Sequence, residues 1–179
     1  IHTVSSEVLA KAAGVKSTQL RKDLTYFGQF GTRGLGYDVT QLIEMISERL
    51  GTKSLQPVVI VGIGNLGRAL LSYRGFAQEG FEVVGAFDVS PSRCLSGNSS
   101  MKVQSMEELP KIIDEHLVKM AVLCVPPTAA QEVANQLIEY GVVAILNFAP
   151  IVLSVPDEVT VNNINLAMEL ENLSYFINE

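Results

Sequence analysis

The chain has 179 residues, of which 47% are hydrophobic and 18% are charged, and its formal net charge is −6. This composition excludes a disordered or fibrous protein, and the length is enough to bury a sizeable hydrophobic core. Its apolar runs are too short to cross a bilayer, two cysteines are too few for a disulfide framework, and no metal-ligand or signal-peptide pattern occurs. We therefore expect a cytoplasmic globular protein with no membrane segment and no metal site.

The charge is distributed unevenly along the chain. Residues 1–37 carry five basic and two acidic side chains, whereas the other residues together have a net charge of −9. A basic end on an acidic body suggests that one region binds a polyanion and that the rest of the chain does not.

The region up to residue 50 is predicted to form a helix, a turn, a second helix, a glycine-rich loop and a third helix. Ser5 or Ser6 is expected to cap the first helix, Ser17 or Thr18 the second, and Asp38 the third. Apolar side chains on the second and third helices are expected to form the core, and those in the glycine-rich loop to anchor a hairpin. On the helices these are Leu20, Leu24, Phe27, Leu42, Ile43, Ile46 and Leu50, and in the loop they are Phe30, Leu35 and Tyr37.

The second of these helices has a polar, basic face opposite its apolar side. Helix-turn-helix proteins present such a face to the major groove of DNA, where amides and guanidinium groups read bases, and hydroxyl groups and lysines bind phosphate. A basic residue in the following loop can enter the minor groove, as a wing does. The alternative is a small helical bundle with a solvated basic face. The side chains predicted to contact DNA are Ser17, Thr18, Gln19, Arg21, Lys22 and, in the loop, Arg33.

Beyond a linker at residues 51–56, apolar strands alternate with amphipathic helices, which predicts a Rossmann-type doubly wound parallel sheet in an α/β protein. The expected strands are 58–62, 82–88, 120–125, 143–147 and 159–161, and the expected helices are 66–73, 107–116 and 129–140. Residues 165–177 are predicted to form a separate helix with one apolar side, which carries Leu166, Leu170, Leu173 and Phe176.

A GxGxxG motif at residues 62–67 follows the first of these strands and opens a helix. Gly62 makes the tight turn, Gly64 lets the backbone approach a pyrophosphate, and Gly67 lets the helix pack closely on the strand. The N–H groups that begin the helix bind phosphate, and Asp88 at the end of the next strand is placed to bind ribose hydroxyls. This context predicts a dinucleotide site rather than a glycine turn that binds no phosphate.

Asp88 also predicts which dinucleotide binds. A carboxylate at this position repels the 2′-phosphate of NADP, so NAD(H) is the expected ligand. Ser90 and Arg93 lie nearby in the sequence and are able to hold that phosphate, which leaves NADP(H) as the alternative.

The sequence offers no catalytic group for this site. His2 is close to the chain end, and His116 is interpreted as a solvated residue at a helix end. Cys124 lies in an apolar run and is interpreted as a small core residue. Because a dehydrogenase needs a general acid or base, we predict a protein that binds the cofactor without consuming it.

Together these segments resemble the Rex family of bacterial redox-sensing transcriptional repressors. The matching stretches are 21–28 (RKDLTYFG), 34–39 (GLGYDV), 62–67 (GIGNLG), 125–126 (VP), 146–150 (LNFAP) and 169–175 (ELENLSY). They run through nearly the whole chain. The first helix of the family's winged-helix domain is not among them, so we expect that a segment precedes Ile1.

The resemblance implies a homodimer that binds double-stranded operator DNA when NADH is scarce relative to NAD⁺ and releases it when NADH binds. It implies a winged-helix domain over residues 1–50, a Rossmann domain over 57–163, and a dimerisation helix over 164–179 that is swapped onto the partner subunit. The NAD(H)-binding residues that it implies are Gly62, Gly64, Asn65, Leu66, Gly67, Asp88 and, at the nicotinamide end, Val125, Pro126 and Phe148.

The resemblance also implies two residues of the switch between DNA-bound and NADH-bound forms. Tyr73 matches a tyrosine that the family uses there; the alternative is a half-buried aromatic at a helix end. Asn165 stands where many members have an acidic residue, and it can form a hydrogen bond but no salt bridge. We therefore expect a redox-sensing repressor and not an enzyme. The alternatives are an NAD-dependent oxidoreductase and an NAD-binding subunit that recognises an acidic protein partner.

Overall fold

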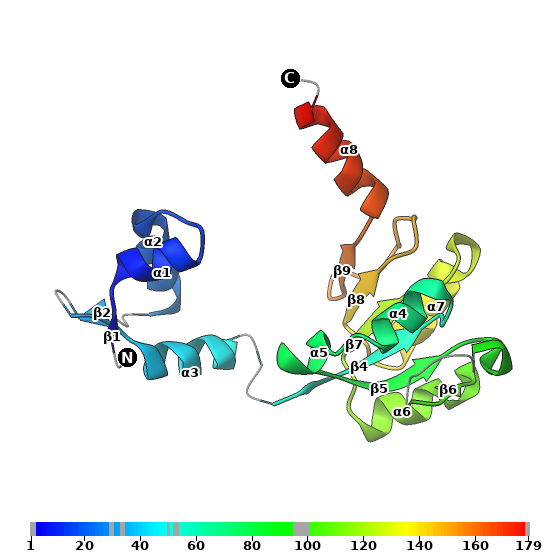
Figure 1. The fold of residues 1–179 in the computed structure, drawn as a ribbon. Coiled ribbons are helices and arrows are strands. Elements are labelled where there is room, and N and C mark those ends of the chain that lie inside the picture. Colours follow the sequence, from blue (N-terminus) through cyan, green and yellow to red (C-terminus); the bar gives the residue numbers. More distant parts are fainter. Residues whose placement is uncertain are drawn as a thin grey trace. The chain divides into compact units, whose positions relative to one another are not determined.

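The computed structural model of the chain describes residues 3–28, 31–32, 35–49, 51, 54–94 and 101–177. The chain divides into two compact units, Ile1–Ser54 and Leu55–Glu179, each with its own hydrophobic core (Figure 1). Among the described residues, no helix is both long and apolar enough to cross a bilayer.

The first unit is a winged helix-turn-helix, as the sequence predicts. Its helices are α1 (Ser6–Ala12), α2 (Ser17–Phe27) and α3 (Val39–Arg49). Its strands β1 (Thr3–Val4), β2 (Gly31–Thr32) and β3 (Gly36–Asp38) form an antiparallel sheet in the order β1-β3-β2. Strands β2 and β3 therefore make the hairpin of the wing, and β1 pairs with the other edge of β3. The sequence pattern did not predict β1.

Two of the predicted helix caps are present in the structure. The Ser5 hydroxyl at the start of α1 accepts a hydrogen bond from the Val8 N–H at 3.2 Å. The Asp38 carboxylate at the start of α3 accepts one from the Gln41 N–H at 2.9 Å. Each cap satisfies an N–H group that the first turn of a helix would otherwise leave without a partner.

The predicted cap of α2 at Ser17 or Thr18 is wrong. The helix begins at Ser17 itself, and the extended residue before it, Lys16, occupies the N-cap position. A lysine side chain has no hydrogen-bond acceptor, so no side chain caps the first N–H groups of α2.

The core of the first unit is smaller than the sequence pattern predicts. Its buried residues are Leu24, Tyr37 and Leu42. A unit this small has a large surface relative to its volume, so its interior cannot hold every apolar side chain. The predicted core residues left exposed are Phe27 (44%), Leu35 (69%), Ile43 (59%) and Ile46 (37%), while Phe30 and Leu50 lie outside the described side chains.

The second unit contains a six-stranded parallel sheet in the order β6-β5-β4-β7-β8-β9. The strands are β4 (Gln56–Val61), β5 (Phe81–Phe87), β6 (Val103–Gln104), β7 (Met120–Leu123), β8 (Ala144–Asn147) and β9 (Thr160–Asn163). The strand order reverses between β4 and β7, the position at which Rossmann folds bind nucleotides. The predicted doubly wound sheet is confirmed.

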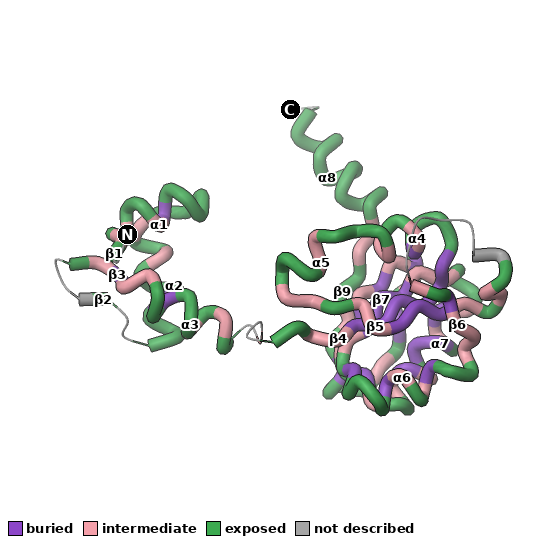
Figure 2. Tube along the Cα trace, turned by 60° about the horizontal axis from the view of Figure 1, so that its bottom comes forward, coloured by how far each residue is buried: buried purple, intermediate pink, exposed green. Residues whose placement is uncertain are grey.

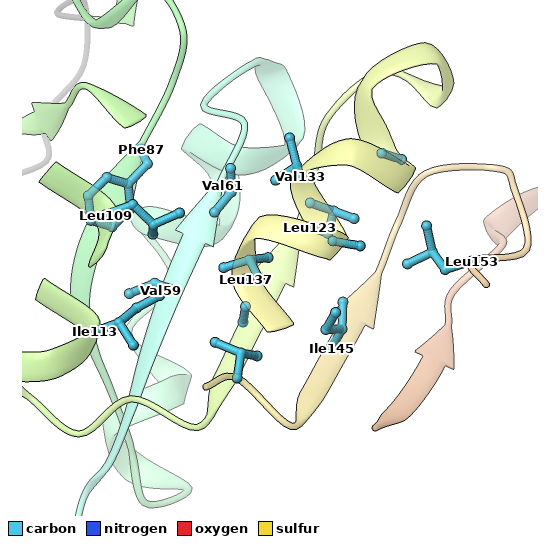
Figure 3. Close-up of a cluster of buried hydrophobic side chains, with 14 of the residues drawn as sticks. Val59, Val61, Phe87, Leu109, Ile113, Leu123, Val133, Leu137, Ile145 and Leu153 are labelled. Carbon is cyan, nitrogen blue, oxygen red and sulfur yellow. The ribbon is translucent and has the colours of Figure 1, made fainter. Parts of the chain in front are cut away.

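Helices cover both faces of this sheet. Successive residues of β4 point to opposite faces, and because residues 58–61 are all apolar, both faces need to be covered. Val59 and Val61 pack with α6 (Leu109–Glu115) and α7 (Pro127–Glu139) in the larger core (Figure 3). Val58 and Ile60 belong to the second core, which contains residues of α4 (Asn65–Leu71). Burial on both faces explains why β4 reads as a continuous apolar run.

The sequence pattern did not predict the shortest elements of this unit. These are β6, the helix α5 (Gly75–Gln78) and the 3-10 helices η1 (Pro91–Cys94) and η2 (Met106–Glu108). Segments of two to four residues are too short to show a hydrophobic period.

The chain after β8 contains no helix until α8 (Leu166–Ile177), which follows β9. Helix α8 buries none of its residues, and Figure 2 shows it exposed along its length. Its predicted apolar side is present but uncovered: Leu166, Leu170, Leu173 and Phe176 are 61% to 69% exposed.

Leu117, directly after α6, adopts the left-handed conformation with a φ of 51°. Its N–H donates to the Asp114 carbonyl, and the Val118 N–H donates to the Ile113 carbonyl at 2.9 Å, which is the Schellman pattern that favours glycine. Because Leu117 is 75% exposed, Leu117→Gly removes strain and loses little burial. We expect the free energy of unfolding of the second unit to rise by about 1 kcal/mol, measured by hydrogen exchange of the β7 amides.

His116→Gly is the matched control, since His116 has a φ of −101°, which any residue adopts. Glycine there increases the freedom of the unfolded chain and is expected to lower the free energy of unfolding by roughly 0.5–1 kcal/mol. Equal effects of the two substitutions would contradict the strain assigned to Leu117.

Candidate functional site

The turn between β4 and α4 requires glycine at two positions because backbone meets backbone there. Gly62 has a φ of +92°, and a Cβ on it would lie 2.6 Å from the carbonyl group of Cys124 on the neighbouring strand end. A Cβ on Gly67 would overlap the carbonyl oxygen of Gly62. At Gly64, in contrast, no described atom lies within 4 Å of the Cβ position. The turn is therefore closed on its strand side and open at Gly64.

Asp88 holds this turn against the end of β5. One carboxylate oxygen accepts a hydrogen bond from the Ile63 N–H at 2.8 Å, and the other accepts one from the Ser90 N–H at 2.8 Å. A carboxylate can accept about four hydrogen bonds. Asp88 therefore fixes the glycine turn and keeps capacity to bind two ribose hydroxyls.

A cavity of about 680 Å³ lies at this edge of the sheet, and we call it the nucleotide cavity. Its volume is within the range of small-molecule sites, roughly 300–1,000 Å³. Seven of the nine predicted NAD(H)-binding residues line it: Gly62, Gly64, Asn65, Leu66, Asp88, Val125 and Pro126. Gly67 and Phe148 are not among the described lining residues; Gly67 is buried beneath the turn, and Phe148 packs against the second core.

Arg68 is a cavity residue that the sequence interpretation missed. It lies one helical turn after Asn65, and its guanidinium donates to the Asn65 side-chain oxygen at 2.7 Å. Residues three apart on a helix share a face, so this spacing was the signal that could have identified it. Arg68 adds a positive charge to the end of α4 where N–H groups already favour an anion. The other lining residues that were not predicted as site residues include Val61, Ile63, Val89, Met106, Cys124, Ala129 and Val133.

Of the other polar groups considered from the sequence, only Ser90 is among the described residues that line this cavity. His116 is exposed at the end of α6, as the sequence predicts. Ser90 lines the cavity, whereas His2 and the Arg93 side chain lie outside the described positions. In the part of the chain that the structure describes, no group of three His, Cys, Asp or Glu residues is placed to hold a metal ion.

The polar face predicted on α2 forms a second candidate surface. Gln19 donates one side-chain N–H to the Asp23 carboxylate at 2.6 Å, which leaves its second N–H and its side-chain oxygen for a ligand. The Arg21 Nε–H donates to the Ser17 carbonyl at 3.1 Å, which leaves the other guanidinium N–H groups for a ligand. Thr18, Gln19, Arg21 and Lys22 are exposed and Ser17 is half-buried, while Arg33 lies outside the described residues.

The two predicted switch residues lie away from the nucleotide cavity. Tyr73 is 60% exposed, and its ring meets the Phe76 ring edge-on with centroids 5.2 Å apart. It lines a second cavity of about 440 Å³, the sheet-face cavity, whose walls include Met120, Val122 and Leu146. Asn165 caps α8, because its side-chain oxygen accepts hydrogen bonds from the N–H groups of Ala167 at 3.1 Å and Met168 at 3.3 Å.

A winged helix-turn-helix and a Rossmann nucleotide cavity in one chain define a DNA-binding regulator that responds to a nucleotide. Residues 53–151 match the CoA binding domain family, and residues 1–25 match the family of putative DNA-binding protein N-termini. The chain is 50% identical over 175 residues to the redox-sensing transcriptional repressor Rex of Streptomyces avermitilis, covering 98% of this chain and 69% of that protein. It is 46% identical to Rex of Pelotomaculum thermopropionicum, covering 98% and 82%.

Solved structures give the same result. The fold matches RSP in complex with β-NAD⁺ and operator DNA with a TM-score of 0.87 and 36% identity, covering 99% of this chain and 82% of that one. It matches RSP in complex with β-NADH with a TM-score of 0.80 and 34% identity, covering 99% and 83%. The chain belongs to the Rex family of redox-sensing transcriptional repressors. The predictions of this family, and of a repressor rather than an enzyme, are confirmed.

Cys124, interpreted from the sequence as a small core residue, packs against the second core and also lines the nucleotide cavity. Burial raises the pKa of its thiol to about 11. Since the thiolate is the reactive form, we expect folded Cys124 to be alkylated at pH 8 roughly 100-fold more slowly than in the urea-unfolded chain. The rate should rise with pH until about pH 11. Mass spectrometry of the Cys124 peptide measures it, and a folded-state rate that levels off near pH 9 would contradict the shift.

Proposed function

We propose that this chain binds operator DNA as a homodimeric repressor and releases it when NADH occupies the nucleotide cavity. The observation that carries this is the combination, in one chain, of an exposed polar helix in a winged helix-turn-helix and a Rossmann cavity with Asp88 at its ribose position. The RSP repressor, which shares the fold, is described in complex with β-NAD⁺ and operator DNA and with β-NADH.

The dinucleotide is proposed to lie across the carboxyl edge of the sheet. Asp88 binds the adenine-side ribose, and its charge disfavours a 2′-phosphate. The pyrophosphate lies at Gly64 and the start of α4, where Arg68 adds its positive charge. The nicotinamide lies toward Val125, Pro126 and Phe148.

The exposed face of α2 is proposed to enter the major groove. Its uncapped first N–H groups and Lys22 bind backbone phosphates, and Arg21 reads a base edge. Gln19 reads a base through its second side-chain N–H and its oxygen, while its first N–H stays bonded to Asp23. Arg33 in the wing enters the neighbouring minor groove.

The homodimer is proposed to form through α8. Its exposed apolar side and the sheet-face cavity are two apolar surfaces that the single chain leaves uncovered. A twofold pair of chains that exchange α8 covers both surfaces at once and gains the free energy of burying them. Tyr73 lies at this contact, and Asn165 sets the first turn of α8.

The switch is proposed to act through this dimer contact. NADH carries a neutral dihydronicotinamide, whereas NAD⁺ carries a charged ring, so the two bind the alternative dimer states with different affinities. A ligand shifts an equilibrium only by its differential affinity for the two states. Asn165 has no charge, so its part in the switch is a hydrogen bond rather than a salt bridge.

A titration of the operator complex tests this function. At fixed salt, we expect saturating NADH to lower the operator affinity, and NAD⁺ to do so much less, with two chains bound per duplex. Fluorescence anisotropy of labelled operator measures both affinities. Operator affinity that neither nucleotide changes, with both nucleotides bound, would contradict the proposed sensor.

Arg21→Ala tests the proposal that α2 reads base edges in the major groove. Loss of a base-reading guanidinium is expected to weaken operator binding by roughly 1–3 kcal/mol and to relax sequence preference at one position. Lys102→Ala is the matched control, because it removes the same charge from an exposed site in the other unit. If both variants weaken operator binding equally, Arg21 contributes only net charge.

A further inference from the structure

Asn147, the last residue of β8, is the only amide or charged side chain that the described residues bury, with an exposed fraction of 0%. A buried amide is costly unless all its groups find partners. The Asn147 side-chain oxygen accepts a hydrogen bond from the Ala149 N–H at 2.9 Å. Its side-chain nitrogen donates to the carbonyls of Ala149 at 3.1 Å and Ile151 at 3.0 Å, and to the side-chain oxygen of Asn163 at 2.8 Å.

One side of this network is the loop after β8, which begins beside the end of β7. Strands β7 and β8 are parallel neighbours with Leu123 opposite Asn147, and the Phe148 N–H donates to the Leu123 carbonyl at 2.9 Å. The loop that begins at Phe148 therefore leaves the sheet beside the loop that carries Val125 and Pro126 into the cavity wall. The segment of the cavity wall that contains Val125 and Pro126 therefore lies next to the loop that Asn147 holds.

The other side of the network is the end of β9, which leads into α8. Asn163 is the last residue of β9, and the Ile164 N–H donates to the Asn147 carbonyl at 2.8 Å. The next residue is Asn165, which caps α8. Asn147 is thus bonded to the chain two residues before the start of the proposed dimerisation helix.

The far part of the loop is held independently. The Gln131 side chain on α7 donates to the Ser154 carbonyl at 2.9 Å and accepts from the Ser154 N–H at 2.8 Å. The loop is thus anchored to the rigid core at Ser154. The side-chain connection between this loop and β9 runs through Asn147. Because the loop is fixed at Ser154, we expect a displacement at Phe148 to reach β9 through Asn147.

We propose that Asn147 is a positioning residue that couples the nicotinamide end of the cavity to α8, through its hydrogen bond to Asn163. The carboxamide holds the loop after β8 and the end of β9 as one unit, so that the occupant of the cavity biases the geometry of the first turn of α8. This inference rests on the proposed function, since it assigns a route to that switch.

Asn163→Leu tests the route without emptying the core, because Asn163 is exposed and Asn147 keeps its bonds to Ala149 and Ile151. We expect unchanged folding, unchanged NADH affinity without DNA and unchanged operator affinity without NADH. The factor by which NADH lowers operator affinity should fall by roughly 2- to 30-fold. The same factor must appear when DNA is the effector and NADH affinity is measured.

Asn163→Asp is the rescue variant, because a carboxylate oxygen still accepts the Asn147 hydrogen bond, and its coupling should remain close to that of the wild-type chain. Asn135→Ala on α7 is the control, since it also removes one amide–amide hydrogen bond, from Gln131, without touching the network. A wild-type coupling factor in Asn163→Leu, or an equal loss in Asn135→Ala, would overturn the role of Asn147. Operator affinity of the wild-type chain that ignores NADH would instead overturn the proposed function and the coupling with it.

Discussion

The nucleotide cavity depends on the close approach of backbone to backbone at the turn after β4. Gly62 lies against the carbonyl group of Cys124, and Gly67 lies against the carbonyl of Gly62, with no space for a Cβ at either position. These contacts bring the start of α4 to the end of the strands, where its N–H groups face the cavity. The Asp88 carboxylate then fixes the same turn to β5 through the Ile63 N–H. A single acidic residue therefore supports the turn and offers acceptors to a ribose.

The second unit is well packed around its central strands but leaves apolar surface uncovered where a partner chain is expected. Its central strands are buried on both faces, and its single buried amide, among the described residues, has a partner for every group. The sheet-face cavity and α8, in contrast, leave apolar surface exposed. A ligand cavity and an uncovered apolar surface on one unit allow a ligand to alter how two chains associate, because the surface gains its stability only in the dimer.

The sequence predicted most of this architecture because its long elements carry clear hydrophobic periods. The order of the long strands and helices of the second unit was correct, and seven of nine proposed cofactor residues line one cavity. Predictions failed where a local pattern had several solutions. Serine and threonine at the start of α2 both suit a cap, yet the helix begins at Ser17 with Lys16 before it. Apolar residues such as Leu35 and Ile43 fit a core pattern, but the small first unit cannot cover them.

By itself, the sequence determined the family, the glycine turn, the acidic residue beside that turn and the helix with a basic face, because each is a local pattern with a local physical cause. Only the tertiary structure decided which distant residues meet. It placed Arg68 and Cys124 in the nucleotide cavity, placed Tyr73 at the separate sheet-face cavity, and joined Asn147 to Asn163. Such contacts depend on strand order and register, which bring together residues far apart in the chain and leave no periodic signal in the sequence.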